Sequence, residues 1–389
     1  MRTSTQIPPQ RFIFPGIAIA LCGVWGAVVH GVPVVVTIVG AWLGLKLWTM
    51  IGITLLLPWQ KGDMVRVYKV FVRVGVFVAV LGVVDYATHG AVSHILGTAT
   101  VRKFRNEAVH SIFPQPGEFS LFMSMLFALT FSSFATYRKV SDLALALLFA
   151  GSVMLSLRLK GFLSLAIVVT IVAIVGAVAN SRGAIAIILA GILLVVGVYS
   201  LEASAITKQI STYTSSESTA RAQLYIAGEH IAGDDFPFGV GFGRFASYPS
   251  RLFYSPVYYQ YGLSNVYGLS RTYPHFIDDT SWPAVMGETG YGGLIIYVVG
   301  LMFIIAAIVR RLLARAGAVQ WAPLAALCAV AALLVDSLGD PMLFDWLATT
   351  ALAMILGPVL VAARPTLDGS KLRPAMNNGG TTTGPVRDF

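Results

Sequence analysis

Charged residues are scarce in this chain of 389 residues, where Asp, Glu, Lys and Arg together make up 12%, against about 25% in an ordinary soluble domain. Hydrophobic residues make up 56%, and the mean hydropathy is +0.76. So little polar surface cannot cover a soluble globule, and the long apolar runs exclude a disordered chain. The composition therefore predicts an all-α polytopic membrane protein.

Cysteine is almost absent as well. Cys22 and Cys328 both lie inside apolar runs, which excludes a disulfide framework and a Cys-x-x-Cys metal motif. The chain has 27 Lys and Arg against 18 Asp and Glu. In a membrane protein, an excess of basic residues first determines how the chain is oriented across the membrane. We therefore expect no nucleic-acid partner. Arg2 and Arg11 before an apolar run imitate a signal peptide, but no small-residue cleavage site ends that run, and we expect an uncleaved first helix.

Ten apolar runs approach the ~20 residues that a spanning helix needs. They lie near 12–29, 33–57, 67–87, 119–136, 142–157, 161–179, 183–200, 289–309, 320–336 and 342–363. The second run carries Lys46 in its middle, so it is either one tilted helix or a broken pair, and the count could rise to 11–12. The chain thus divides into seven spans (1–200), a large polar loop with short helices (201–283), three spans (284–363) and a disordered tail (364–389).

Lysine and arginine gather in alternate short loops, as the positive-inside rule requires of cytoplasmic loops. With a cytoplasmic N-terminus, the inward bases are Lys61, Arg66, Arg138, Lys139, Arg182, Arg310, Arg311, Arg315 and those of the tail. The opposite connections at 30–32 and 336–340 contain no Lys or Arg. We therefore expect both termini in the cytoplasm and the loop 201–283 in the periplasm.

One short loop breaks this rule. Arg158 and Lys160 occupy the tight turn between the fifth and sixth spans, on the side expected to be poor in bases. Eight more bases share that side: Arg102, Lys103, Arg105, Lys208, Arg221, Arg244, Arg251 and Arg271. Long loops are translocated across the membrane regardless of their charge, but this exemption does not apply to a very short turn. The exception favours an anionic ligand over a lipid-headgroup anchor.

The large loop combines a helical pattern, a glycine run and many aromatic residues. Leu224, Ala227 and Ile231 recur at helical spacing, which predicts a short amphipathic helix on the membrane surface. Gly239, Gly241 and Gly243 allow a tight turn, and Gly241 and Gly243 could let main-chain amides approach an anion beside Arg244. Ten aromatic residues follow between 245 and 276, including Tyr258 and Tyr259. They suit sugar rings, or they form an interfacial belt and the loop's own core.

Three stretches resemble the O-antigen ligase and O-antigen polymerase superfamily of bacterial inner-membrane proteins. Ser156-Leu157-Arg158-Leu159-Lys160-Gly161 stands where that family has a Ser-Arg-Gly-like turn before a span. Arg221 opens a helix that leads into Pro237-x-Gly239-x-Gly241-x-Gly243. Asp279 precedes Glu288-Thr289-Gly290-Tyr291-Gly292-Gly293 at the start of a span. The family's ligases usually place His where Asp279 aligns, and here the nearest histidine is His275.

The resemblance implies glycosyl transfer at the periplasmic face of the inner membrane. The donor would be an undecaprenyl-pyrophosphate-type lipid-linked saccharide, and the acceptor a saccharide or lipid A–core. Arg158 and Arg221, supported by Lys160 and Arg244, would neutralise the departing pyrophosphate. The base that takes the acceptor's proton is left open among His275, Asp279 and Glu288. Tyr258, Tyr259 and Arg271 would bind the saccharide.

No metal and no other cofactor is expected, because the first outer connection, at 30–33, offers no carboxylate and arginines can replace a cation. The alternative class is a transporter or flippase of an anionic lipid-linked glycan. That alternative predicts paired charges within the membrane and helices broken at corresponding positions of two halves. Charge within the spans is sparse, with Lys46 in mid-span and Lys69, Arg73 and Asp345 nearer the ends. The large asymmetric loop favours an enzyme.

Overall fold

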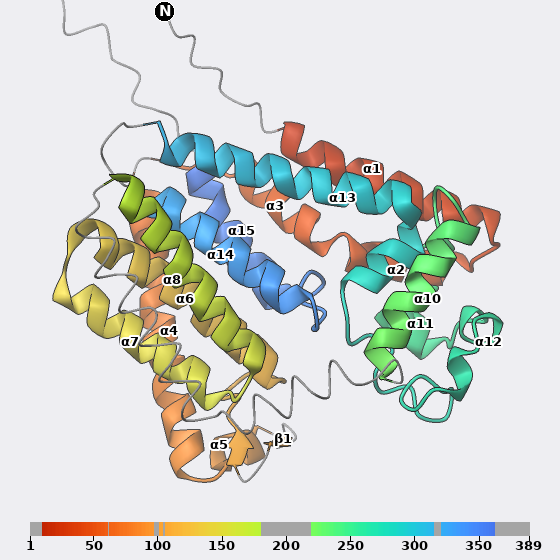
Figure 1. Ribbon diagram of the computed structural model, residues 1–389, viewed down its shortest axis with the longest axis horizontal. Coiled ribbons are helices and arrows are strands. Elements are labelled where there is room, and N and C mark those ends of the chain that lie inside the picture. The colour runs from red at the N-terminus through yellow and green to blue at the C-terminus, as the bar shows by residue number, and fades with distance from the viewer. Residues whose placement is uncertain are drawn as a thin grey trace, which may run out of the picture.

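The computed structural model describes residues 10–60, 62–96, 101–103, 106–179, 219–314 and 320–361. These residues form helices joined by loops, with one small antiparallel hairpin (Figure 1). The bundle helices are α1 (Gln10–Val29), α2 (Val34–Gly44), α3 (Lys46–Leu56), α4 (Asp63–Ala87), α5 (Ala91–Ile95), α6 (Pro116–Tyr137), α7 (Val140–Leu155), α8 (Leu159–Ala179), α13 (Trp282–Leu312), α14 (Trp321–Ser337) and α15 (Trp346–Val361). The hairpin pairs β1 (Val101–Lys103) with β2 (Asn106–Ala108).

The helices confirm a helical protein able to span a membrane. Among the described residues, α1, α4, α6, α8 and α13 are long and apolar enough to cross a bilayer, and α2 with α3 makes a sixth if the bent pair is one span. That pair is the broken form of the second run, with a bend of 59° before Lys46. Helices α7, α14 and α15 are shorter and apolar. The run 183–200 and the tail lie outside the described residues, so the count of ten stays a prediction.

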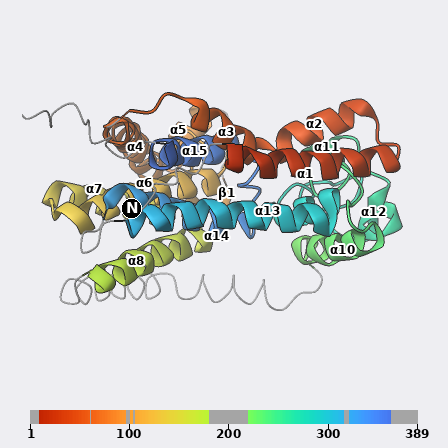
Figure 2. The same cartoon turned by 90° about the horizontal axis from the view of Figure 1, so that it is seen from above.

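Burial shows which helices are central and which are peripheral. In α6, 83% of its most apolar stretch is buried, against 28% in α4. Helix α6 packs against α7, α8 and α14, while α1 lies along α13 and α15 along α3 (Figures 1 and 2). The hydroxyls of Ser124 and Thr130, buried in α6, donate to the carbonyls of Ser120 and Leu126, both at 2.8 Å. Hydroxyls satisfied within their own helix allow the close packing that spanning helices require.

Residues 219–281, called here the cap, form a compact unit at one end of α1, α2 and α13 (Figure 1). The cap contains α10 (Ala220–Asp234), α11 (Tyr248–Leu252), α12 (Val257–Gln260) and the 3₁₀ helix η1 (Leu263–Asn265). The side chain of Thr219 caps α10 by accepting the amide hydrogen of Ala222. Short helices were expected here and are present.

The position of α10 corrects one expectation. Its apolar side chains Leu224, Ala227 and Ile231 are buried in a hydrophobic cluster of the cap, and α10 packs on α13. The helical periodicity therefore reflects a protein interior, and this face of α10 does not lie on a membrane surface. Periodicity identifies an apolar face without saying what covers it.

Helix α13 is interrupted at Gly290, whose φ of 66° and ψ of −175° are not helical. The carbonyl of Pro237 fills the gap and accepts the amide hydrogen of Gly292 at 2.9 Å. The freed carbonyls of Gly287 and Glu288 accept the amides of Val240 and Gly241, each at 3.0 Å. Residues 237–247, called here the glycine loop, thus supply hydrogen-bond partners for backbone groups that the break in α13 frees.

The glycine loop also packs on α1 and α2 at backbone contact. A Cβ atom on Gly241 would lie 2.2 Å from the amide nitrogen of Ala27, and one on Gly40 would lie 2.5 Å from that of Gly243. Glycine is required at 241 for a second reason, because its φ is +90°. These glycines hold the cap to the bundle.

Replacing Gly241 by alanine should therefore destabilise the protein. The left-handed backbone and the clash with α1 together should cost roughly 2–4 kcal/mol. Gly233→Ala is the matched control, because Gly233 lies in α10 with open space around its Cβ position. Thermal unfolding of the detergent-solubilised protein should show a lower midpoint for Gly241→Ala and an unchanged or higher one for Gly233→Ala. Equal midpoints would contradict the packing role of the loop.

Candidate functional site

Six charged residues from distant parts of the chain meet where the bundle adjoins the cap. They are called here the charged cluster: Arg158, Lys160, Arg221, Asp279, Asp336 and Asp340. They come from the turn between α7 and α8, the first turns of α8 and α10, the segment before α13, the end of α14 and the loop that follows α14. Arg158, Lys160, Arg221 and Asp279 were singled out from the sequence, and the fold brings all four together.

Two ion pairs organise the cluster. The Nζ atom of Lys160 lies 2.6 Å from Oδ2 of Asp340, and the side chains are 14% and 5% exposed. Arg221 pairs with Asp279. Asp336 accepts a hydrogen bond from the hydroxyl of Ser164 at 3.0 Å. Lys160 also interacts electrostatically with Arg221, and Arg158 with Asp336, so the pairs form one network.

The turn between α7 and α8 places Arg158 and Lys160. Ser156 is buried at the end of α7, where its hydroxyl donates to the carbonyl of Val153 at 2.6 Å. Leu157 then takes a left-handed backbone with φ of 50°. Gly161 lets α8 approach α6, since a Cβ atom there would lie 2.2 Å from Oγ of Ser120. The serine of this motif is a local cap, and the bases beyond it project toward the cluster.

The cluster is balanced in charge, which the sequence did not reveal. Three cations face three aspartates, whereas Asp336 and Asp340 had been noted only as part of a connection without bases. Buried ions of one sign alone would be strongly unfavourable, so the aspartates make the buried cations tolerable. Within the described part of the chain, the buried Nε of Arg158 has no hydrogen-bond partner. That group remains able to bind a ligand.

Titration of the cluster follows from its burial. Burial raises the pKa of Asp279, while the neighbouring Arg221 opposes this shift. Burial also raises the pKa of Tyr225 to about 12, and its hydroxyl donates to the carbonyl of Leu338 at 2.8 Å. Tyr225 thus joins α10 to the loop that carries Asp340.

Glu288 lies in the broken part of α13, fully committed to the glycine loop. Its Oε1 accepts the amides of Gly243 at 2.9 Å and Phe245 at 3.2 Å, and the hydroxyl of Ser247 at 2.5 Å. The Glu288 residue is only 3% exposed to solvent. The structure gives Glu288 the role of a brace for the loop, and its predicted role as a base stays a prediction.

The amides of the glycine loop are used inside the protein. Besides those bound to α13 and Glu288, the amide of Phe242 donates to the carbonyl of Gly23 at 3.2 Å. Gly241 and Gly243 therefore have no amide hydrogen left for an anion in this structure. Arg244 lies near Asp235, which in turn bonds His30, on the side of α1 and α2. No contact among the described residues joins Arg244 to the charged cluster.

The remaining predicted residues lie within the cap and apart from the cluster. His275 and Arg271 line an open pocket of about 470 Å³ together with Arg251 and Tyr254, and the His275 ring stacks on Tyr273 with centroids 3.9 Å apart. Tyr259 is 55% exposed. Tyr258 is fully buried, and its hydroxyl accepts the amide hydrogen of Ala246 at 2.9 Å. Tyr258 thus belongs to the core of the cap.

Comparison with protein-family models and with curated proteins finds no match for the chain. The likeness to O-antigen ligases and polymerases stays a hypothesis that the geometry has to support. Within the described residues, no three His, Cys, Asp or Glu side chains are grouped as metal ligands would be. The expected independence from metals stays a prediction.

Breaking the buried pair of the cluster should cost more stability than breaking an exposed one. Lys160→Met leaves Asp340 without its cation and should lower the free energy of unfolding by about 3–5 kcal/mol, and adding Asp340→Asn should restore much of the loss. The control is Arg66→Gln, which breaks a pair with Asp63 whose arginine side chain is 79% exposed and should cost less than about 1 kcal/mol. Denaturant titration in mixed micelles measures all three, and additive losses in the double variant would argue against a buried pair.

Proposed function

We propose that the protein is an integral membrane glycosyltransferase of the O-antigen polymerase or ligase type. It would transfer a saccharide from a polyprenyl-pyrophosphate carrier to a saccharide or lipid A–core acceptor during surface polysaccharide synthesis. The observation that carries the proposal is the juxtaposition of Arg158 and Arg221 in one cluster, although 62 residues separate them in the chain. Both belong to motifs on which the resemblance rests.

The chemistry of the cluster supports this assignment. A departing pyrophosphate concentrates negative charge, and guanidinium groups match its oxygens with a planar fork of donors. The unpartnered Nε of Arg158 offers a first donor within the described residues. Asp279 holds Arg221, so the guanidinium is positioned before the ligand arrives. Such preorganisation lowers the cost of stabilising charge that develops during transfer.

The location of the cluster fits transfer at the periplasmic face of the bacterial inner membrane. The bases of the short loops orient the bundle with both termini inside, which puts the cap and the cluster outside. Ten spans are expected in this arrangement, and the run 183–200, which lies outside the described residues, would be the seventh. A lipid-linked donor would then reach the cluster from the outer leaflet, where its pyrophosphate lies near the membrane surface.

A second candidate is a transporter of a lipid-linked anionic glycan, and two observations favour it. Helices α2 and α3 bend by 59° beside the buried Lys46, and α13 is broken at Gly290. Broken helices at mid-membrane are typical of transporters. Here, however, both breaks lie against the glycine loop, which braces them through Glu288 and Gly40. Helix breaks held in place in this way suit a rigid active site better than a transport site that opens alternately to the two sides of the membrane.

Alanine at Arg158 or Arg221 should each abolish transfer. The assay incubates purified protein with an undecaprenyl-pyrophosphate-linked oligosaccharide and resolves products on a gel, where a ladder indicates a polymerase. If both arginines stabilise one transition state, the double alanine variant should be little worse than either single variant. Lysine at either position should restore only part of the rate, because it keeps the charge and loses the fork.

Arg310→Ala is the control for these variants, because Arg310 is exposed in the last turn of α13. It should transfer at the wild-type rate. Defects that multiply in the double variant would mean that the arginines act separately. Movement of the lipid-linked glycan across a vesicle membrane without transfer would favour the transporter.

Cysteine labelling should place the cap in the periplasm and the end of α13 in the cytoplasm. Gln260 and Leu313 are exposed and lie at these two places, while the native Cys22 and Cys328 are buried. In intact spheroplasts an impermeant maleimide should label Gln260→Cys and spare Leu313→Cys until the membrane is opened. Labelling of both from one side would refute the orientation and with it a periplasmic site.

A further inference from the structure

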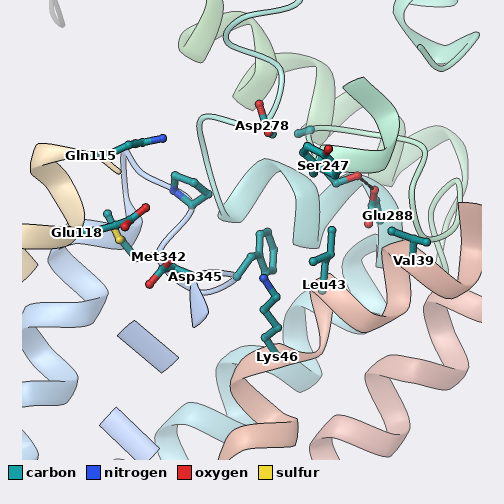
Figure 3. Close-up of a pocket in the computed structure, with 15 residues that line it drawn as sticks. Val39, Leu43, Lys46, Gln115, Glu118, Ser247, Asp278, Glu288, Met342 and Asp345 are labelled. Carbon is teal, nitrogen blue, oxygen red and sulfur yellow. Dashed lines mark hydrogen bonds between the residues drawn. The ribbon is translucent and has the colours of Figure 1, made fainter. Parts of the chain in front are cut away.

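A second polar site lies beside the charged cluster. It is a cavity of about 380 Å³ between the bend of α2 and α3, the start of α6, the glycine loop and the loop before α15 (Figure 3). Its volume lies in the range of small-molecule pockets, about 300–1,000 Å³. Its polar lining comes from Lys46, Gln115, Glu118, Ser247, Asp278 and Asp345, with Glu288 at one wall. Of these residues, Glu288 belongs to one of the three sequence motifs, and Lys46 and Asp345 were noted only as charges within spans.

Most polar groups of the lining already have partners. Asp278 pairs with Arg251 at 3.1 Å, and Asp345 accepts the amide of Ala348 at 2.7 Å. Glu288 holds the glycine loop. Lys46, Gln115 and Glu118 differ, because within the described part of the chain no hydrogen bond or ion pair joins their side chains to another residue.

Lys46 is a buried cation that faces this space. It is 6% exposed, and its Nζ lies 4.7 Å from the ring centroid of Trp346. Figure 3 shows its side chain, like that of Glu118, directed into the cavity. A lysine at this depth costs free energy unless something compensates it, and among the described residues the ring of Trp346 and the charge of Asp345 do so in part. The cavity therefore offers the ammonium group of Lys46, the carboxyl group of Glu118 and the amide of Gln115 to a ligand.

The charge of the lining selects the kind of ligand. Four carboxyl groups and one ammonium group make the cavity unsuitable for a pyrophosphate, in contrast to the arginine-bearing cluster. Carboxylate, amide and hydroxyl groups match the many hydroxyls of a sugar, and Tyr248 and Phe344 add aromatic surface. An uncharged sugar or an amino sugar fits this chemistry.

Glu118 lies at the boundary of the two sites. It interacts electrostatically with Asp345, in the cavity wall, and with Asp340, the partner of Lys160. The preceding Gly117 is so close to this loop that a Cβ atom there would lie 2.9 Å from Oδ2 of Asp340. The start of α6 and the loop before α15 thus border both the cavity and the cluster.

We infer that the cavity binds the terminal sugar of the acceptor and that Glu118 takes the proton from its attacking hydroxyl, an inference that rests on the proposed function. The acceptor oxygen forms the new bond to the anomeric carbon while the bond from that carbon to the pyrophosphate oxygen breaks. The pyrophosphate leaves with the electron pair toward Arg158 and Arg221. The hydroxyl proton passes to the Glu118 carboxylate, so charge and atoms balance.

The kinetic test uses the purified full-length protein and the transfer assay described above. Glu118→Gln keeps the size of the side chain and removes its basicity, so the transfer rate should fall at least about 100-fold while the KM for the lipid-linked donor stays unchanged. Glu118→Asp should recover part of the rate. Glu229→Gln, at an exposed position of α10, should behave as wild type, and the unfolding midpoints should show that all variants are folded.

A binding test does not depend on transfer. Gln115→Cys places a thiol at the cavity, where maleimide labelling should be slowed by millimolar glucose, N-acetylglucosamine or glucosamine, and hardly by glucuronate or inorganic pyrophosphate. Protection by pyrophosphate, or by none of these sugars, would overturn the assignment of the cavity. A normal rate for Glu118→Gln would overturn the role of the carboxylate.

The two proposals fail in different ways. A wild-type protein that transfers no saccharide would defeat the proposed function, whereas sugar protection at position 115 would still support the cavity. Transfer by the wild type without sugar protection would defeat the cavity alone.

Discussion

The buried carboxylate of Glu288 is the interaction on which the rest of the structure depends. It sits where α13 breaks and collects hydrogen bonds from Gly243, Phe245 and Ser247. An acidic group in this apolar helix is tolerated because the break supplies hydrogen-bond donors around it. Without this brace, the amides of Gly243 and Phe245 would be unpaired, and a buried amide without a partner costs about 1–3 kcal/mol. The same bonds fix the position of the cap on the bundle.

The first half of α13, Trp282–Thr289, links this brace to the charged cluster. Asp279 precedes that half-helix and pairs with Arg221, while Glu288 ends it. The hydroxyl of Ser281 donates to the carbonyl of Asp340 at 3.0 Å, which joins the half-helix to the loop before α15. Displacement of the glycine loop would therefore shift the Arg221–Asp279 pair through the half-helix itself. It would shift the Lys160–Asp340 pair through the hydrogen bond of Ser281. The positions of the ion pairs in the charged cluster therefore depend on how the glycine loop packs, although that loop lies more than ten residues away from these pairs along the chain.

Hydropathy and charge predicted much of this arrangement, because both depend on composition over a stretch of chain. The expected runs within the described residues became helices, and Arg158 stood out because its short turn broke the positive-inside rule. The motifs also brought Arg221 and Asp279 into consideration. Asp336 and Asp340 were missed because two acids in a connection without bases look like an ordinary outer loop. Their role appears only when α14 is placed beside α8, a long-range contact that no local pattern encodes.

Glu118 escaped notice for a related reason. A single carboxylate at the start of an apolar helix is usual, since acidic side chains favour helix N-termini. Only the fold shows that this helix start faces both a cavity and the partner of Lys160. The two neighbouring sites differ in character, one with arginines balanced by aspartates and the other with carboxylates and one lysine. An anionic pyrophosphate and a hydroxyl-rich sugar would therefore favour two adjacent sites, which would bring the reacting groups together beside Glu118.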